Sequence, residues 1–357
     1  MSNNEHLKTT AYTLFIVLSL GFLLYIGSSL FIPLVFATFL AVILSPVDVK
    51  LRKLFKFKSI SIIASFILLL IPFVLVTILF SYQLMSISDS LPSIDSSLRR
   101  GIEKLFTKVN ALIPILDLDS KKIISQSTGE DISGPLKFIG QSLISTSKFF
   151  TGAGVAILFT FFFLYYKGSI KNYIIHQFNK KHQEDTKDTL GSIQETIQSY
   201  IAGLGLVVVI LSVLNSLGLF LIGIDYAIFW GVLGGILAMI PFIGTLIGGA
   251  LPFAFAVATS DSIWPPILIL IYYLIIQQVE GNLITPKIIG DKVDINPMFA
   301  ILALLIFGSF WGISGVVLAI PLISICKIVM SQFDSTLPIA TLMGSNIDKK
   351  KGIFKRM

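Results

Sequence analysis

The side chains best suited to chemistry lie in the stretch QQVEGN, residues 277–282, where a long apolar run ends. Glu280 supplies a carboxylate, and Gln277, Gln278 and Asn282 surround it with amides. At the end of a membrane segment, such a group can bind a cation, a proton or a polyhydroxy ligand. It can equally form a polar cap at the interface, and the sequence leaves both interpretations open.

Two further segments combine proline with several glycines: PFIGTLIGGALP (Pro241 to Pro252) and GSFWGISGVVLAIP (Gly308 to Pro321). In lipid, Pro and Gly are tolerated where other groups satisfy the freed backbone. Secondary transporters use discontinuous helices to place free carbonyls and half-helix ends at a substrate or ion site. Close helix packing through small residues is the alternative explanation.

Enzymatic chemistry is disfavoured. Gly312-Ile313-Ser314-Gly315 matches the G-x-S-G pattern of intramembrane serine proteases, but a nucleophilic serine needs a base and no histidine follows His182. His176 and His182 have no cysteine or third histidine near them, so they do not indicate a metal site. The chain also lacks a P-loop, paired intramembrane aspartates and an H-E-x-x-H motif. We therefore expect no enzyme, no cofactor and no bound metal.

The composition indicates that these segments are embedded in a membrane. The chain has 357 residues, of which 54% are hydrophobic and 13% charged. Soluble domains carry about 25% charged residues, so too few polar side chains remain to cover several water-facing surfaces. The formal net charge is +7, but the positive residues cluster in short loops between apolar runs, where they act as topology signals. We therefore expect contact with the lipid bilayer and none with nucleic acid.

Windows without charge predict an all-α, polytopic membrane protein with about eight transmembrane helices, some broken at Pro or Gly, and a small soluble insertion. A span needs about 20 apolar residues. The spans are predicted as two between residues 8 and 48 with a turn near Gly27, then about 59–82, 149–166, 199–222, 226–260, 263–276 and 295–326. The two long windows, 226–260 and 295–326, each predict either one long span or a broken hairpin.

The distribution of charge predicts the organisation and orientation of the chain. Residues 1–82 form three spans, 83–147 an extracytoplasmic insertion, 148–330 the transport region and 331–357 a basic cytoplasmic tail. The loop at 48–58 is rich in Lys and Arg, so it should be cytoplasmic. Parity then places the polar segment 167–198 and both termini in the cytoplasm, and the expected location is the plasma (inner) membrane.

The last third of the chain resembles the autoinducer-2 exporter family of bacterial permeases, and the layout of spans extends this resemblance over nearly the full length. The stretches IPFIGTLIGGALP (240–252), QQVEGNLITPKIIGDKVDINP (277–297) and AIPL (319–322) carry it. By position, the matching residues are Pro241, Phe242, Gly244, Gly248 and Pro252 in the first motif, and Glu280, Gly281, Asn282, Pro286, Lys287 and Pro297 in the second.

The resemblance implies a transporter for a small solute; members are linked to export of the furanone signal autoinducer-2, and others to sodium or proton antiport. We expect coupling to an ion gradient, because no nucleotide site is visible. We also expect the segments 241–252 and 277–297 to meet and line the pathway, with Glu280 as the ionisable group. The alternatives are a sodium/proton antiporter of the same family, a passive channel, and a non-transporting scaffold that binds through the 83–147 insertion. The Gly-rich faces permit a homo-oligomer.

Overall fold

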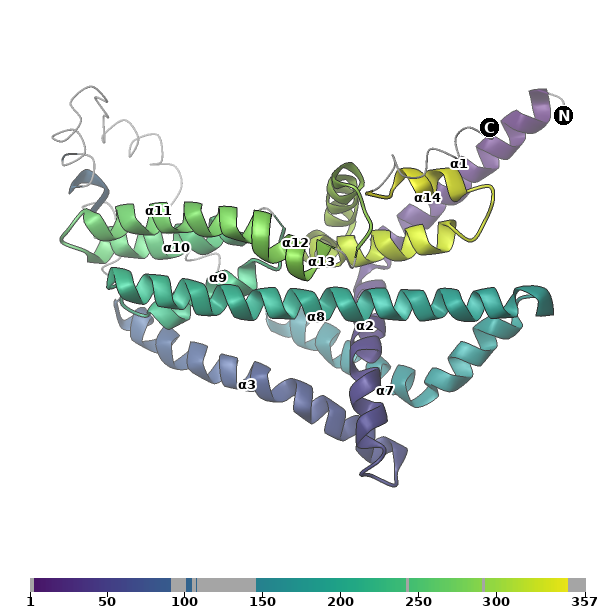
Figure 1. Cartoon of the computed structure of the whole chain (residues 1–357), viewed down its shortest axis with the longest axis horizontal. Helices are drawn as coiled ribbons and strands as arrows, with labels where there is room; N and C mark the ends of the chain where they lie inside the picture. The colour runs from purple at the N-terminus through teal and green to yellow at the C-terminus, as the bar shows by residue number, and fades with distance from the viewer. Residues whose placement is uncertain are drawn as a thin grey trace. The chain divides into compact units, whose positions relative to one another are not determined.

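The computed structural model describes residues 3–90, 101–104, 107, 146–241, 244–290 and 293–345. These residues form helices and turns, with no strand among them (Figure 1). Six helices of this part of the chain are long and apolar enough to cross a membrane, and three shorter apolar helices accompany them. The prediction of an all-α polytopic membrane protein is therefore confirmed.

Most helices are long. They are α1 (Asn3–Ile26), α2 (Ser28–Leu51), α3 (Lys58–Ser90), α7 (Thr146–His176), α8 (Gln183–Ile222), α9 (Ala227–Leu237), α10 (Gly244–Thr259), α11 (Trp264–Val279), α12 (Thr285–Ile288), α13 (Pro297–Met330) and α14 (Leu337–Leu342). A 3₁₀ turn at Lys180–His182 precedes α8, and a π-helical segment at Glu280–Ile284 joins α11 to α12. The predicted turn at Gly27 separates α1 from α2.

The chain divides into two compact units that interleave along the sequence. Unit 1 comprises Met1–Phe66, Ser147–Tyr200 and Lys292–Met357, and unit 2 comprises Ile67–Thr146 and Ile201–Asp291. The division predicted from charge, with its boundaries near 82, 147 and 330, concerns sides of the membrane and stays a prediction.

Unit 1 is held by a small apolar core and by polar links between distant segments. Ala41 and Leu44 of α2, Ile62 of α3 and Leu164 of α7 are buried together. Pro46 has no N–H, so the carbonyl of Val42 lacks its usual helical donor, and Gln198 Nε2 donates to that carbonyl at 2.8 Å. A side chain from α8 therefore satisfies the backbone that a proline leaves open in α2.

In unit 2, the small helix α9 packs between α8 and α10. Its glycines allow the close approach: Gly231 faces Ser216 of α8, and a methyl group on Gly248 of α10 would lie only 2.9 Å from the Cα of Gly234. The aromatic side chains of Phe229, Trp230 and Phe255 fill the core on one side of this crossing. In Figure 1, α10 and α11 (green) run side by side along the same unit.

Both long windows that the sequence left open are interrupted. In the window 226–260, α9 ends at Leu237 and a separate helix, α10, begins at Gly244. In the window 295–326, α13 is kinked at Gly312, where φ is 58° and ψ is −139°. At about 1.5 Å per residue, the 11 residues of α9 span only ~16 Å, against a hydrocarbon core of ~30 Å. The lengths therefore favour the broken-hairpin alternative for the first window, because α9 is too short to cross alone.

Candidate solute site

The first predicted motif lies where α9 turns into α10. Pro241 follows the end of α9, and Gly244, Gly248 and Pro252 are buried in α10, whereas Phe242 lies outside the described residues. Proline has no N–H, so Pro252 cannot donate the helical hydrogen bond that the carbonyl of Gly248 would otherwise accept. The motif therefore places a backbone acceptor without its regular donor at the crossing of α9 and α10.

Polar atoms from three helices converge beside Gly234 at this crossing. A Cβ atom on Gly234 would lie 3.1 Å from the Tyr273 hydroxyl, 3.2 Å from Asn215 Nδ2 and 3.7 Å from the Gly248 carbonyl oxygen. Asn215 comes from α8, Tyr273 from α11 and Gly248 from α10. Trp230 lies one helical turn before Gly234, on the same face of α9. We call these five residues the Gly234 cluster.

The side chains of the Gly234 cluster are buried without hydrogen-bond partners. Asn215 is 0% exposed, Trp230 2% and Tyr273 7%. Both amide atoms of Asn215, the indole N–H of Trp230 and the hydroxyl of Tyr273 have no partner in the described part of the chain. An unpaired buried polar group costs about 1–3 kcal/mol, and native structures keep few of them. The cluster therefore offers donors and acceptors that a bound molecule can satisfy.

The second predicted motif begins in a π-helical segment, Glu280–Ile284, at the end of α11. Glu280 is half-buried, and Gln277, Gln278, Gly281 and Asn282 are exposed. Asn282 Nδ2 donates to the carbonyl and to Oε1 of Gln278, both at 3.0 Å. Single π-turns inside helices are rare and are frequent at functional sites.

The turn that precedes the first motif approaches the second motif within unit 2. Ala238, just after α9, and Ile284, in the π segment, pack against the same buried cluster around Ile276. Tyr273 of α11 and Glu280, the first residue of the π segment that continues it, are seven residues apart, which places them on one helix face, about 10 Å apart along the axis. The face that carries the Gly234 cluster thus continues toward the Glu280 carboxylate.

The remaining residues of the second motif lie in two different helices, α12 and α13. Pro286 and Lys287 are exposed in α12. Pro297 belongs to unit 1, where it starts α13, and Asn296 caps that helix by accepting from the backbone N–H of Phe299 at 3.0 Å. The Asn296 amide also donates to the carbonyl of Leu342 at 2.6 Å. The motif therefore divides between the two units, and its last residues fix the start of α13.

Asp294, beside this cap, joins two distant segments of unit 1. Its carboxylate accepts from Lys327 Nζ at 2.6 Å and from the backbone N–H of Ser345 at 2.8 Å. Partial burial raises the pKa of Asp294, but the hydrogen bonds from Lys327 and Ser345 outweigh burial and hold the pKa well below its ordinary range. These contacts give Asp294 a structural role, because its carboxylate holds the end of α13 and residue Ser345 together.

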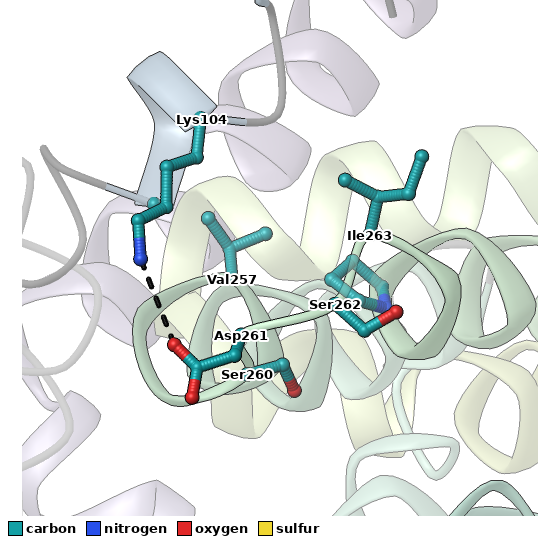
Figure 2. Close-up of a pocket in the computed structure, with 8 residues that line it drawn as sticks. Lys104, Val257, Ser260, Asp261, Ser262 and Ile263 are labelled. Atoms are coloured by element: carbon teal, nitrogen blue, oxygen red, sulfur yellow. Dashed lines mark ion pairs between the residues drawn. The ribbon is translucent and has the colours of Figure 1, made fainter. Parts of the chain in front are cut away.

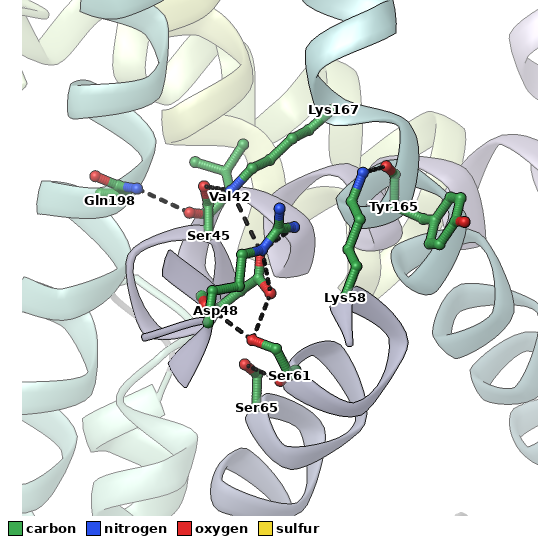
Figure 3. A network of polar contacts seen from close by, with 10 residues as sticks. Val42, Ser45, Asp48, Lys58, Ser61, Ser65, Tyr165, Lys167 and Gln198 are labelled. Atoms are coloured by element: carbon green, nitrogen blue, oxygen red, sulfur yellow. Dashed lines mark hydrogen bonds and ion pairs between the residues drawn. The ribbon is translucent and has the colours of Figure 1, made fainter. Parts of the chain in front are cut away.

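Sequence reasoning missed a buried ionic network in unit 1 (Figure 3). The sequence places Asp48 at the start of the basic loop 48–58, but α2 continues to Leu51 and the side chain of Asp48 is 0% exposed. Its carboxylate accepts from Arg52 at 2.7 and 3.1 Å, from Lys167 at 3.3 Å and from Ser61 at 2.9 Å. Nearby, Lys58 donates to the carbonyl of Tyr165. The network ties α2, α3 and α7 together.

A small hollow forms where residues 101–104 contact the loop between α10 and α11 (Figure 2). Lys104 Nζ lies 3.6 Å from the Asp261 carboxylate, whose side chain is fully exposed. Exposed ion pairs are screened by water and contribute little. We therefore assign no function to this hollow.

Comparison with known proteins shows which sequences this chain resembles. The sequence profile described as AI-2E family transporter matches residues 14–334. A protein of Haemophilus influenzae (strain Rd) is 24% identical over 98% of this chain and 100% of its own length, and PerM of Escherichia coli (strain K12) is 27% identical over 90% of this chain and 92% of its own length. YrrI of Bacillus subtilis (strain 168) is 33% identical, but the match covers only 40% of each chain. These relatives carry provisional names as transport proteins or as a permease, and the names state no substrate.

Proposed function

Because the chain belongs to the AI-2E transporter family, we propose that it is a carrier that moves a small solute through unit 2 across the plasma membrane. The family and the six long apolar helices identify a multi-pass membrane protein of a transporter family. We propose in addition that this chain transports a solute, and we propose which substrate it carries and which energy source it uses.

One observation carries the proposal: the buried, unpaired polar atoms of the Gly234 cluster lie where a broken helix pair crosses. In lipid, irregular backbone is tolerated where it is buried in protein or lines a cavity. Transporters place substrate sites at such interrupted helices. The segments 241–252 and 277–290 therefore contribute the pathway, together with Asn215 and Tyr273.

We further propose that Glu280 couples transport to an ion gradient. It is a half-buried carboxylate directly after α11, on the side of the helix that carries Tyr273, and no side chain pairs with it among the residues that the structure describes. Sodium/proton antiport is the second candidate function, because a carboxylate at a π segment suits a cation or a proton. Export of a furanone signal is a candidate for the solute that rests on family resemblance. The proposed orientation has both termini in the cytoplasm, on the side of the basic residues 50–58.

Flux measurements in proteoliposomes test the proposal. Wild-type protein, Glu280→Gln and the matched control Glu184→Gln, which changes an exposed glutamate in α8, are reconstituted side by side. Uptake of furanones, sodium and protons is then followed with and without an imposed ion gradient. We expect gradient-driven accumulation by wild type and the control, and a loss of at least about tenfold in Glu280→Gln with normal folding.

Three results would contradict parts of this scheme. Equal flux by Glu280→Gln and wild type removes Glu280 from the mechanism. Flux without counterflow or accumulation indicates a channel rather than a carrier. A protein that transports nothing but loses its function when the 83–147 insertion is deleted is a scaffold.

A further inference from the structure

We propose that the Gly234 cluster binds a hydroxyl or carbonyl oxygen of an uncharged solute, so that the transported substrate is an uncharged, hydroxyl-bearing molecule rather than the coupling ion. This inference deepens the proposed function, on which it rests. It assigns Asn215, Tyr273 and the carbonyl of Gly248 as the groups that contact the solute.

The donor and acceptor set of the Gly234 cluster points to an uncharged ligand. Asn215 offers an amide N–H and an amide oxygen, Tyr273 a hydroxyl that donates and accepts, and Trp230 an N–H that only donates. The cluster offers a metal cation three oxygen atoms, from Asn215, Tyr273 and the Gly248 carbonyl, which is fewer than the roughly six to eight that hard cations such as calcium take. The N–H groups of Asn215 and Trp230 would stay unpaired beside the cation. None of the five residues is charged, so neither a cation nor an anion finds a counter-charge within the cluster. Hydroxyl groups, which donate and accept, complement all of these atoms.

Close packing explains the glycines of the crossing but not its polar side chains. Leucine in place of Asn215 and phenylalanine in place of Tyr273 would fill a similar volume, and both would avoid leaving buried polar atoms unpaired. The adjacent Tyr272 shows the contrast, because its hydroxyl donates to the carbonyl of Leu214 at 2.6 Å. The two neighbouring tyrosines on α11 therefore differ in hydrogen bonding: the hydroxyl of the half-buried Tyr272 is engaged, and that of the buried Tyr273 has no partner among the described residues.

The crossing also indicates how the solute enters. Gly234 and Gly248 bring α9 and α10 into direct backbone contact, so the cluster is closed in this structure. Separation of the two helices would expose the Asn215 amide, the Tyr273 hydroxyl and the Gly248 carbonyl together. A hydroxyl-bearing solute between the helices would then satisfy atoms that the closed packing leaves unpaired.

Thermal unfolding of the purified full-length protein tests the assignment without requiring transport. The probes are erythritol, ribitol and myo-inositol, with sodium chloride against choline chloride as the ionic comparison. Tyr273→Phe and Asn215→Leu remove the unpaired groups, and Tyr272→Phe is the matched control that removes the engaged hydroxyl. Non-specific effects of polyols are common to all four proteins, so the difference between them reports binding at the cluster.

We expect at least one polyol to raise the midpoint of wild type and Tyr272→Phe with an apparent affinity at least about tenfold higher than for the two cluster variants. We also expect Tyr273→Phe, without ligand, to unfold at or above the wild-type temperature, which shows that it folds. The inference is overturned if all four proteins respond equally to every polyol, or if sodium rather than a polyol produces the difference. Binding at the cluster without flux in vesicles would refute the proposed function and leave the subsite standing.

Discussion

The buried carboxylate of Asp48 allows a stability prediction in some detail. The substitution Asp48→Ala removes the acceptor that Arg52, Lys167 and Ser61 share. Removing one partner of a buried ion pair costs about 3–5 kcal/mol, because the remaining charge is left uncompensated. The side chains of Arg52 and Lys167 are 31% and 33% exposed, so both cations regain part of their hydration. We therefore expect a loss near the lower bound, about 3 kcal/mol.

A second substitution at the same position separates charge from hydrogen bonding. Asp48→Asn keeps the volume and one carbonyl oxygen, so it should lose only the charge-assisted part of the network, about 1–2 kcal/mol. Asp261→Asn is the matched control, because the exposed Asp261 pairs with Lys104 at the surface and should have no measurable effect.

The assay is reversible unfolding in mixed detergent micelles by an increasing fraction of denaturing detergent, with the midpoint and the free energy of unfolding compared between the variants. The expected order of stability is wild type and Asp261→Asn together, then Asp48→Asn, then Asp48→Ala. If Asp48→Ala is as stable as wild type, or if Asp48→Asn is the less stable of the two, the network does not hold α2, α3 and α7 together.

Two further predictions concern Asp294 and Pro252. The pKa of Asp294 is lowered in the folded protein by Lys327, so this carboxylate stabilises the fold above its ordinary pKa; the contribution is lost as the pH falls from about 4 through the folded pKa. Unfolding midpoints measured from about pH 7 down to pH 3 should fall more for wild type than for Asp294→Asn, and parallel curves would contradict this role. Pro252→Ala supplies an N–H at position 252 that can donate to the carbonyl of Gly248, and the penalty of about 3 kcal/mol for a mid-helix proline exceeds roughly 1.6 kcal/mol for two lost ring methylenes. We expect a higher unfolding temperature with reduced flux; unchanged flux would show that the freed carbonyl has no part in transport.

The sequence predicted the fold well, because the absence of charge is a strong signal in a membrane protein. The gap between Lys8 and Asp48 gave α1 and α2, and Gly27 marked their junction. The Pro and Gly content of 241–252 also indicated an interruption, which the structure places between Leu237 and Gly244. Composition and spacing suffice for such features, since each depends on residues close in sequence.

The central residues of the candidate site could not be predicted in this way. Asn215 and Tyr273 are uncharged and lie inside apolar spans, so a search for ionisable groups passes over them. They become candidate site residues only because the fold brings α8 and α11, which carry them, beside Gly234 of α9. Asp48 was missed because Lys167, one of its partners, is 119 residues away in sequence. Phe242 and residues 91–100, 105–106 and 108–145 of the insertion lie outside the described residues, and the orientation in the membrane stays a prediction.

The backbone conformation at the Gly312 kink restricts the chirality of the amino acid that can occupy this position. Its φ of 58° and ψ of −139° form the mirror image of the polyproline II conformation, which L residues adopt at about −75° and +145°. A D-alanine would therefore fit at this position without strain, whereas L-alanine, with only one methyl group more than glycine, would not. No coded side chain substitutes for glycine there at low strain, because every other coded residue is an L residue. The kink of α13 therefore depends on the one coded residue that is achiral.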